Sequence, residues 1–173
     1  MKNYLSILPI ALVLSLFSAP AAHAISVSVE GGGSMTSGAA FDAFSSSGTQ
    51  AAGSVSISLF PLLDLGAFYK GAQYSVENES DAKLGTSFYG LLLRTKVPFV
   101  FVEARAGKFK FDQSLAGEKL AYGAVIGKDL FSLGIAKLAL IASYQTAPYK
   151  NDNTGAEASG TLLDYGLRLS VGF

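Results

Sequence analysis

Seven charged residues of this sequence lie within apolar segments, where each alternates with Leu, Val, Ile, Ala or Tyr. They are Lys70, Arg94, Glu103, Arg105, Lys137, Asp164 and Arg168. The alternation predicts that all seven lie on one face of a set of strands. If that face is enclosed, the charges need partners, because an unpaired buried charge is very costly. We therefore expect either an ion-pair network that fixes strand register or a narrow, ion-selective path lined by the same charges.

The side chains that most enzymes use as nucleophiles, bases and metal ligands are nearly absent. The chain has no Cys, and its single His is His23, close to the N-terminus. Hydrolases built on Ser–His or Cys–His pairs are therefore excluded from the rest of the chain. The acidic run Glu77-x-Glu79-x-Asp81 lacks the Gly and the terminal Glu of a calcium loop, so we interpret it as solvated surface. We predict a protein without catalysis, without a cofactor and without a bound metal.

The first 24 residues have the pattern of a cleaved signal peptide. Lys2 supplies positive charge, residues 7–17 form a short apolar core, and Ala22-x-Ala24 matches a small-residue cleavage site. The apolar core is too short for a comfortable transmembrane helix, although an uncleaved anchor is the alternative. We predict cleavage after Ala24 and a single domain over residues 25–173.

Eight later segments alternate apolar residues with small or polar ones at a period of two, which is typical of strands with two different faces. They lie at 25–30, 54–59, 63–70, 89–94, 100–107, 120–127, 137–145 and 163–173. Several approach the ~9–11 residues that a tilted strand needs to cross a bilayer. The first, second and fourth segments are only marginally long enough.

The connections between these segments alternate between long and short. Long polar stretches lie at Ser34–Ala52, Ser75–Leu84, Asp112–Glu118 and Ala147–Ser159, and short links lie near Phe60–Leu62, Thr95–Pro98 and Lys128–Leu133. This asymmetry is typical of outer-membrane barrels, which have short periplasmic turns and long outer loops.

The two faces of the predicted strands differ in composition. One is nearly pure Leu, Val, Ile, Ala and Tyr, whereas the other carries the seven charges mixed with Gly and Ser. A lipid-facing exterior and a packed polar interior explain both faces, and hydrocarbon requires the sheet to close because it offers backbone groups no partner. A soluble barrel or sandwich with the faces reversed is the alternative, since the period alone does not show which face is inside.

The chain ends on apolar residues at every second position. They are Tyr165, Leu167, Leu169, Val171 and Phe173. This segment resembles the C-terminal assembly signal of outer-membrane β-barrel proteins, which end in Phe or Trp and are recognised by the barrel-insertion machinery. In length, strand count and loop pattern, residues 25–173 resemble the eight-stranded OmpA/OmpX-type barrels, although Trp is absent here. The resemblance implies an all-β, antiparallel, up-and-down transmembrane β-barrel of eight strands in the outer membrane of Gram-negative bacteria, with membrane lipid, lipopolysaccharide and the barrel-assembly machinery as partners.

Two lysines mark a further predicted contact. Lys108 and Lys110 share the parity of the apolar stripe at 100–106 and directly precede a predicted outer loop. There they are expected to contact lipopolysaccharide phosphates. The alternative is that both side chains simply extend to water.

The whole pattern predicts an integral outer-membrane protein with a structural or surface-interaction role through four extracellular loops. The alternative function is a narrow porin-like channel for small solutes or ions. The formal charge is balanced, with 13 basic and 13 acidic residues, and no basic run indicates nucleic acid. No motif names a surface ligand.

Overall fold

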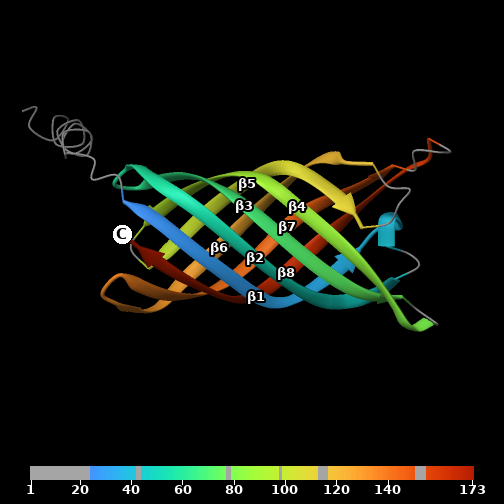
Figure 1. Cartoon of the computed structure of the whole chain (residues 1–173), viewed down its shortest axis with the longest axis horizontal. Coiled ribbons are helices and arrows are strands. Elements are labelled where there is room, and N and C mark those ends of the chain that lie inside the picture. Colours follow the sequence, from blue (N-terminus) through green and yellow to red (C-terminus); the bar gives the residue numbers. More distant parts are fainter. Residues whose placement is uncertain (1–23, 42–43, 77–78, 98, 113–116, 151–154) are drawn as a thin grey trace, which may run out of the picture.

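A computed structural model describes residues 24–41, 44–76, 79–97, 99–112, 117–150 and 155–173. Eight strands form one closed antiparallel barrel in which each strand pairs with its neighbours in the chain and the first pairs with the last (Figure 1). The strands are β1 (Ile25–Ser37), β2 (Phe44–Phe60), β3 (Leu63–Val76), β4 (Glu79–Val97), β5 (Val100–Phe111), β6 (Lys119–Leu133), β7 (Ala136–Lys150) and β8 (Glu157–Gly172). The predicted fold class is confirmed.

Side chains alternate between the lumen and the outer surface along the strands. In β5, Glu103 and Arg105 are buried, whereas Ala104 between them and Val102 and Ala106 on either side are exposed. An eight-stranded barrel has an interior just wide enough for its own side chains, so the inward set is packed and the outward set faces the surroundings. The charged face is thus the inside, as the membrane-barrel interpretation predicted.

The strands are longer than predicted. β1, β2 and β4, which contain the three segments expected to be marginal, have 13, 17 and 19 residues. The predicted loops Ser34–Ala52 and Ser75–Leu84 are therefore wrong in extent, because most of their residues belong to strands. Ser, Gly and Ala lack the apolar alternation that marks a strand, but the antiparallel ladder needs only their backbone groups.

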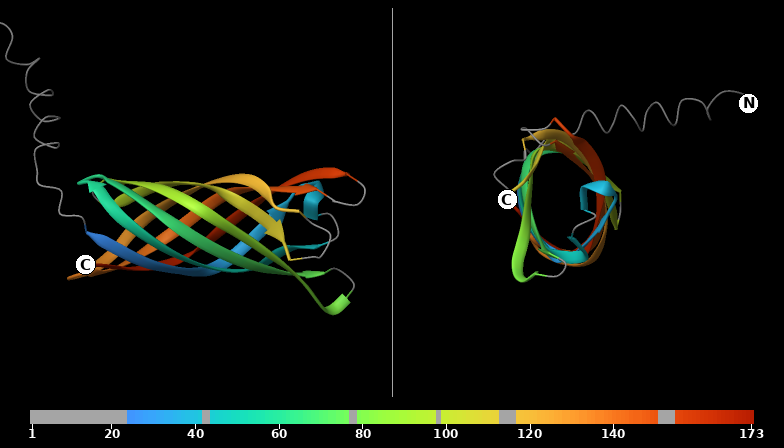
Figure 2. Two further views of the ribbon diagram at one scale, coloured as in Figure 1. Left: turned by 45° about the horizontal axis from the view of Figure 1, so that its top comes forward. Right: turned by 90° about the vertical axis from the view of Figure 1, so that its right-hand side faces the viewer.

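The two ends of the barrel differ (Figure 2). The short connections from β2 to β3, from β4 to β5 and from β6 to β7 lie at the end that we call the turn end. The C-terminus also lies there, where the Phe173 N–H donates to the Ile25 carbonyl at 2.8 Å. The longer connections lie at the other end, the loop end, where the 3₁₀ helix η1 (Ala39–Phe41) packs against β1, β2, β7 and β8. The predicted long connections are present between β1 and β2, β5 and β6, and β7 and β8, whereas only residues 77 and 78 separate β3 from β4, so the predicted alternation fails there.

In the described part of the chain, no helix is long and apolar enough to cross a membrane. Residues 1–23, which hold almost all of the predicted signal peptide, lie outside the described residues. β1 begins at Ile25, the residue after the predicted cleavage site. The signal peptide and its removal stay predictions.

Candidate functional site

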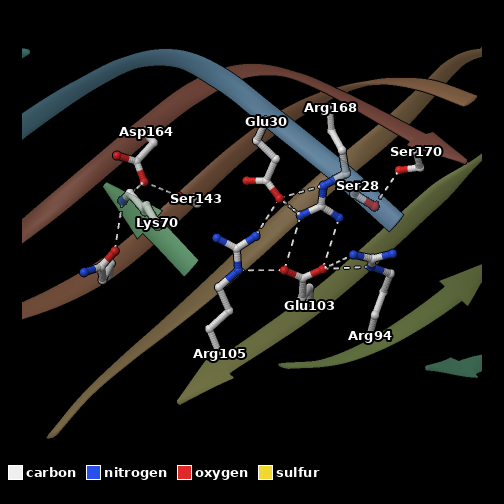
Figure 3. Close-up of polar contacts among 11 residues, drawn as sticks. Ser28, Glu30, Lys70, Arg94, Glu103, Arg105, Ser143, Asp164, Arg168 and Ser170 are labelled. Atoms are coloured by element: carbon white, nitrogen blue, oxygen red, sulfur yellow. Dashed lines mark hydrogen bonds and ion pairs between the residues drawn. The ribbon is translucent and has the colours of Figure 1, made fainter. Parts of the chain in front are cut away.

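Charged side chains meet in one layer across the lumen (Figure 3). Glu103 lies at its centre and is completely buried. Its carboxylate accepts hydrogen bonds from Arg94 Nε at 2.7 Å, Arg105 Nε at 2.6 Å and Arg168 Nη1 at 3.1 Å. One carboxylate thus binds three guanidinium groups from β4, β5 and β8. We call these four residues together with Glu30 the ionic layer.

Glu30 of β1 supplies the second carboxylate of the ionic layer. Its Oε1 accepts hydrogen bonds from Arg105 Nη2 at 2.7 Å and from Arg168 Nε at 2.9 Å. Glu30 and Arg168 are direct register partners on β1 and β8, and Arg94 and Glu103 are register partners on β4 and β5. Because these strand pairs lie on opposite sides of an eight-stranded ring, the layer ties the two walls of the barrel together.

A second cluster centres on Asp164 of β8 (Figure 3). Asp164 forms an ion pair with Lys70 of β3 at 2.6 Å and accepts hydrogen bonds from Ser34 at 2.7 Å and from Ser143. Lys70 also donates to Gln145 Oε1 at 2.9 Å. Like the ionic layer, this cluster joins strands that do not neighbour one another.

The fourth buried carboxylate, that of Asp64 in β3, lies nearer the turn end. Lys96 of β4 pairs with it at 2.6 Å, and Ser58 donates to it at 2.8 Å. Arg94 Nη1 is 3.9 Å from Asp64 Oδ2, so this carboxylate also borders the ionic layer. Lys96 is the partly exposed member of the group.

The buried charges of the described lumen are balanced in sign. The acids are Glu30, Asp64, Glu103 and Asp164, and the bases are Lys70, Arg94, Arg105 and Arg168. Each has an ionic partner within 4 Å. Pairing of this kind offsets the cost of removing charges from water.

Six of the seven charged residues expected in the interior are therefore buried there. The prediction is wrong for Lys137, which is not buried. It faces the lumen near the start of β7 but is exposed at the turn end, and it forms no ion pair within the described ranges. Sequence reasoning also left out Glu30 and Asp64. Both have the inward parity of their strands, which is the signal that finds them, but Glu30 lies in a Gly-rich segment and Asp64 directly follows a turn.

The lumen on the loop-end side of the ionic layer is filled by apolar side chains, which we call the apolar plug. It comprises Phe41, Phe68, Ala72, Tyr74, Leu84, Phe88, Leu92, Phe109, Phe111, Ala121, Ala147 and Leu162. Phe41 enters it from η1, with ring centroids 5.8 Å from Tyr74 and 5.5 Å from Phe111. The Arg105 guanidinium lies 5.0 Å from the centroid of Phe68, a cation–π contact that joins plug and ionic layer.

Comparison with known proteins gives a structural likeness only. No protein-family model matches the sequence, and no curated protein is significantly similar to it. Among solved structures, Neisserial surface protein A (NspA) superposes with a TM-score of 0.56 at 14% identity, over 84% of this chain and 97% of that one. The outer membrane protein AlkL, solved in lipid bilayers, superposes with a TM-score of 0.53 at 12% identity, over 90% of this chain and 93% of that one.

The chain has the fold of the small outer-membrane β-barrels. The C-terminal segment closes this barrel, because β8 pairs with both β7 and β1. Tyr165, Leu167, Leu169 and Phe173 are exposed on the outer surface, and Val171 is partly buried. Their role as an assembly signal is not visible in a finished barrel and stays a prediction.

Phe173→Asp is expected to reduce assembly in cells severely while leaving the purified chain able to refold in detergent. Phe173 is outward and largely exposed, so its loss removes little packing from the folded barrel. The measurement is the fraction of chain in the membrane that shows heat-modifiable migration on gels. Normal assembly of the variant would contradict the predicted signal, and failure to refold in detergent would indicate a packing role instead.

The predicted lipopolysaccharide contacts lie on the outer surface toward the loop end. Lys108 pairs with Glu118 at 2.6 Å, and the Tyr89 hydroxyl donates to the same carboxylate at 2.5 Å. Glu118 lies between β5 and β6. The hydrogen bond from Lys108, and to a smaller extent the one from Tyr89, lowers the pKa of the Glu118 carboxyl. Lys108 is therefore already partnered, whereas Lys110 forms no ion pair with the residues that the structure describes. Of the acidic run at 77–81, Glu77 lies outside the described residues, and Glu79 and Asp81 belong to the start of β4.

Proposed function

We propose that this protein is an integral protein of a bacterial outer membrane, with a structural or surface-interaction role at its loop end and with a closed, non-catalytic lumen. The observation that carries the proposal is the combination of an apolar outer wall with an interior filled by the ionic layer and the apolar plug.

The outer wall supports a membrane setting. Large apolar residues such as Leu91 (64% exposed) are displayed on every strand. A soluble monomer rarely exposes a contiguous apolar surface of this extent, whereas a lipid-facing wall requires one. Exposed aromatic rings further mark the ends of the band: Phe60, Phe99, Phe131 and Phe173 near the turn end, and Tyr69, Tyr122, Tyr144 and Tyr165 further along the strands. Such aromatic girdles are typical of transmembrane barrels.

The strands are longer than a bilayer requires, which supports a surface role for the loop end of the barrel. About 9–11 tilted residues cross a bilayer, whereas β4 has 19 residues and β2 has 17. With the turn end at the periplasmic face, the excess length carries the loop end beyond the outer leaflet. A rigid barrel that projects its connections in this way is suited to presenting them to surface partners.

The filled lumen supports a structural role over the alternative of a channel. Arg and Glu side chains span its middle, and aromatic rings fill its loop-end half. The same pairing supports the absence of catalysis, since the buried carboxylates are bound to cations rather than presented to a substrate.

The purified barrel is expected to show no stepwise conductance in planar lipid bilayers, because no continuous water path passes a lumen so filled. Insertion is checked by flotation of the protein with vesicles, and folding by heat-modifiable migration. Steady current steps from protein that passes both checks would favour the channel. A chain that fails to float with vesicles would contradict the membrane proposal itself.

A further inference from the structure

A cavity of about 380 Å³ opens at the turn end, below the ionic layer. Its charged lining consists of Arg94, Lys96, Lys137 and Arg168 against the single acid Asp129. The volume lies at the small end of the range of about 300–1,000 Å³ typical of ligand pockets. The cavity is therefore large enough for a small polar group and is biased toward a negative one.

Two of these cations have donors left for a ligand. Lys137 has no acidic partner in the described portion of the chain. Arg94 donates a hydrogen bond to Glu103 through Nε, whereas its buried Nη2 lies 2.7 Å from the same carboxylate as an ion pair but has no hydrogen-bond partner among the described residues. Arg168, in contrast, uses its donors on Glu30 and Glu103. The uncommitted donors are therefore those of Lys137 and of one Arg94 nitrogen.

The rim of the cavity is apolar, which is unusual for turns that would face an aqueous periplasm. Leu62, Val97, Phe99 and Ile135 line the cavity and are all exposed. Phe99 is 74% exposed and has φ 69°, in the left-handed region that favours glycine. A bulky exposed ring in a strained turn position indicates that the ring itself has a use.

We propose that this cavity binds the phosphate headgroup of an anionic phospholipid from the periplasmic leaflet. Lys137 and Arg94 contact the phosphate, and the apolar rim packs against the glycerol and upper acyl region of the same lipid. A free anion would need the cations but not the apolar rim, and an apolar tail would need the rim but not the cations. A phospholipid headgroup with its upper acyl region uses both. This inference rests on the proposed membrane setting, because only there does the rim meet lipid.

The test is native mass spectrometry of the full barrel in a maltoside detergent with added phosphatidylglycerol or phosphatidylcholine. We expect preferential retention of phosphatidylglycerol and about threefold weaker retention in Lys137→Gln, the size expected for one exposed charge contact. Lys128→Gln is the matched control, because Lys128 lies at the same end but on the outer face. Equal retention of the two lipids, or equal effects of the two substitutions, would overturn the proposal.

A second variant and a competitor separate the lipid from a free anion. Phe99→Gly removes the ring and suits the left-handed turn, so weaker phosphatidylglycerol retention in a stably folded variant supports the rim contact. Full displacement of phosphatidylglycerol by millimolar inorganic phosphate would overturn the lipid assignment in favour of a free-anion site. Each variant is first checked for heat-modifiable migration and vesicle insertion, so that loss of lipid preference in an inserted barrel counts against this inference and not against the proposed function.

Discussion

Glu103→Gln is expected to lower the free energy of unfolding of the barrel by about 3–5 kcal/mol, the usual cost of removing one partner from a buried ion pair. The substitution leaves Arg94, Arg105 and Arg168 facing one another with Glu30 as the remaining carboxylate of the layer. The next described acid, Asp64, is 3.9 Å from Arg94 Nη1 and is already paired with Lys96, so it does not replace Glu103 without rearrangement. The measurement is urea unfolding in detergent micelles. The folded fraction is read from unheated gels, on which the folded barrel migrates differently from the unfolded chain.

Adding Arg105→Gln to that variant is expected to restore part of the lost stability. The ionic layer holds three arginines and two glutamates, so its net charge is 3 − 2 = +1. It becomes +2 in Glu103→Gln and returns to +1 in the double variant. The matched control is Glu118→Gln, which removes an exposed carboxylate bound to Lys108 and should leave stability unchanged. A double variant that is clearly less stable than Glu103→Gln would show that the charges do not act as one network.

Much of the barrel follows from the sequence because a period of two carries both strand identity and side-chain direction. Glu103 and Arg105, two residues apart, are on the same face in any strand, and the structure brings them to 2.6 Å. Closure of the barrel follows from the same pattern. An apolar outer face indicates that the sheet is surrounded by hydrocarbon, and the backbone N–H and C=O groups of an open sheet edge would have no hydrogen-bond partner there.

The failures of prediction have local physical causes. Ser34–Ala52 was expected to be a loop because Ser, Gly and Ala show no apolar period, yet backbone pairing extends the strands through most of it. Strand parity shows which face of the sheet a residue lies on, but it does not show how far along the barrel axis the residue lies. It therefore placed Lys137 among the buried charges, although the residue lies where the lumen widens into the turn-end cavity. The entry of Phe41 into the plug depends on how η1 folds over the mouth, which no strand period encodes.

Leu167→Arg is expected to destabilise the barrel in phospholipid vesicles by about 2–4 kcal/mol, the cost of an arginine on the lipid face near the bilayer midplane. Leu167 is exposed on the outer wall of β8, with Tyr165 and Leu169 as its outward neighbours. On a water-exposed surface, the same substitution would change stability by no more than about 0.5 kcal/mol. The size of the effect therefore reports what the outer wall touches.

Gln73→Arg is the matched control for this measurement. Gln73 is also exposed on the outer face, but it lies on β3 near the loop end, where the cost of an arginine falls to about 0–1 kcal/mol. Unfolding of both variants is followed by urea titration of vesicle-inserted protein. A large cost at Leu167 with little at Gln73 requires hydrocarbon against the middle of the wall. Small and equal costs at both positions would mean that water reaches the whole outer surface, and the charged lumen would then need an explanation other than a membrane.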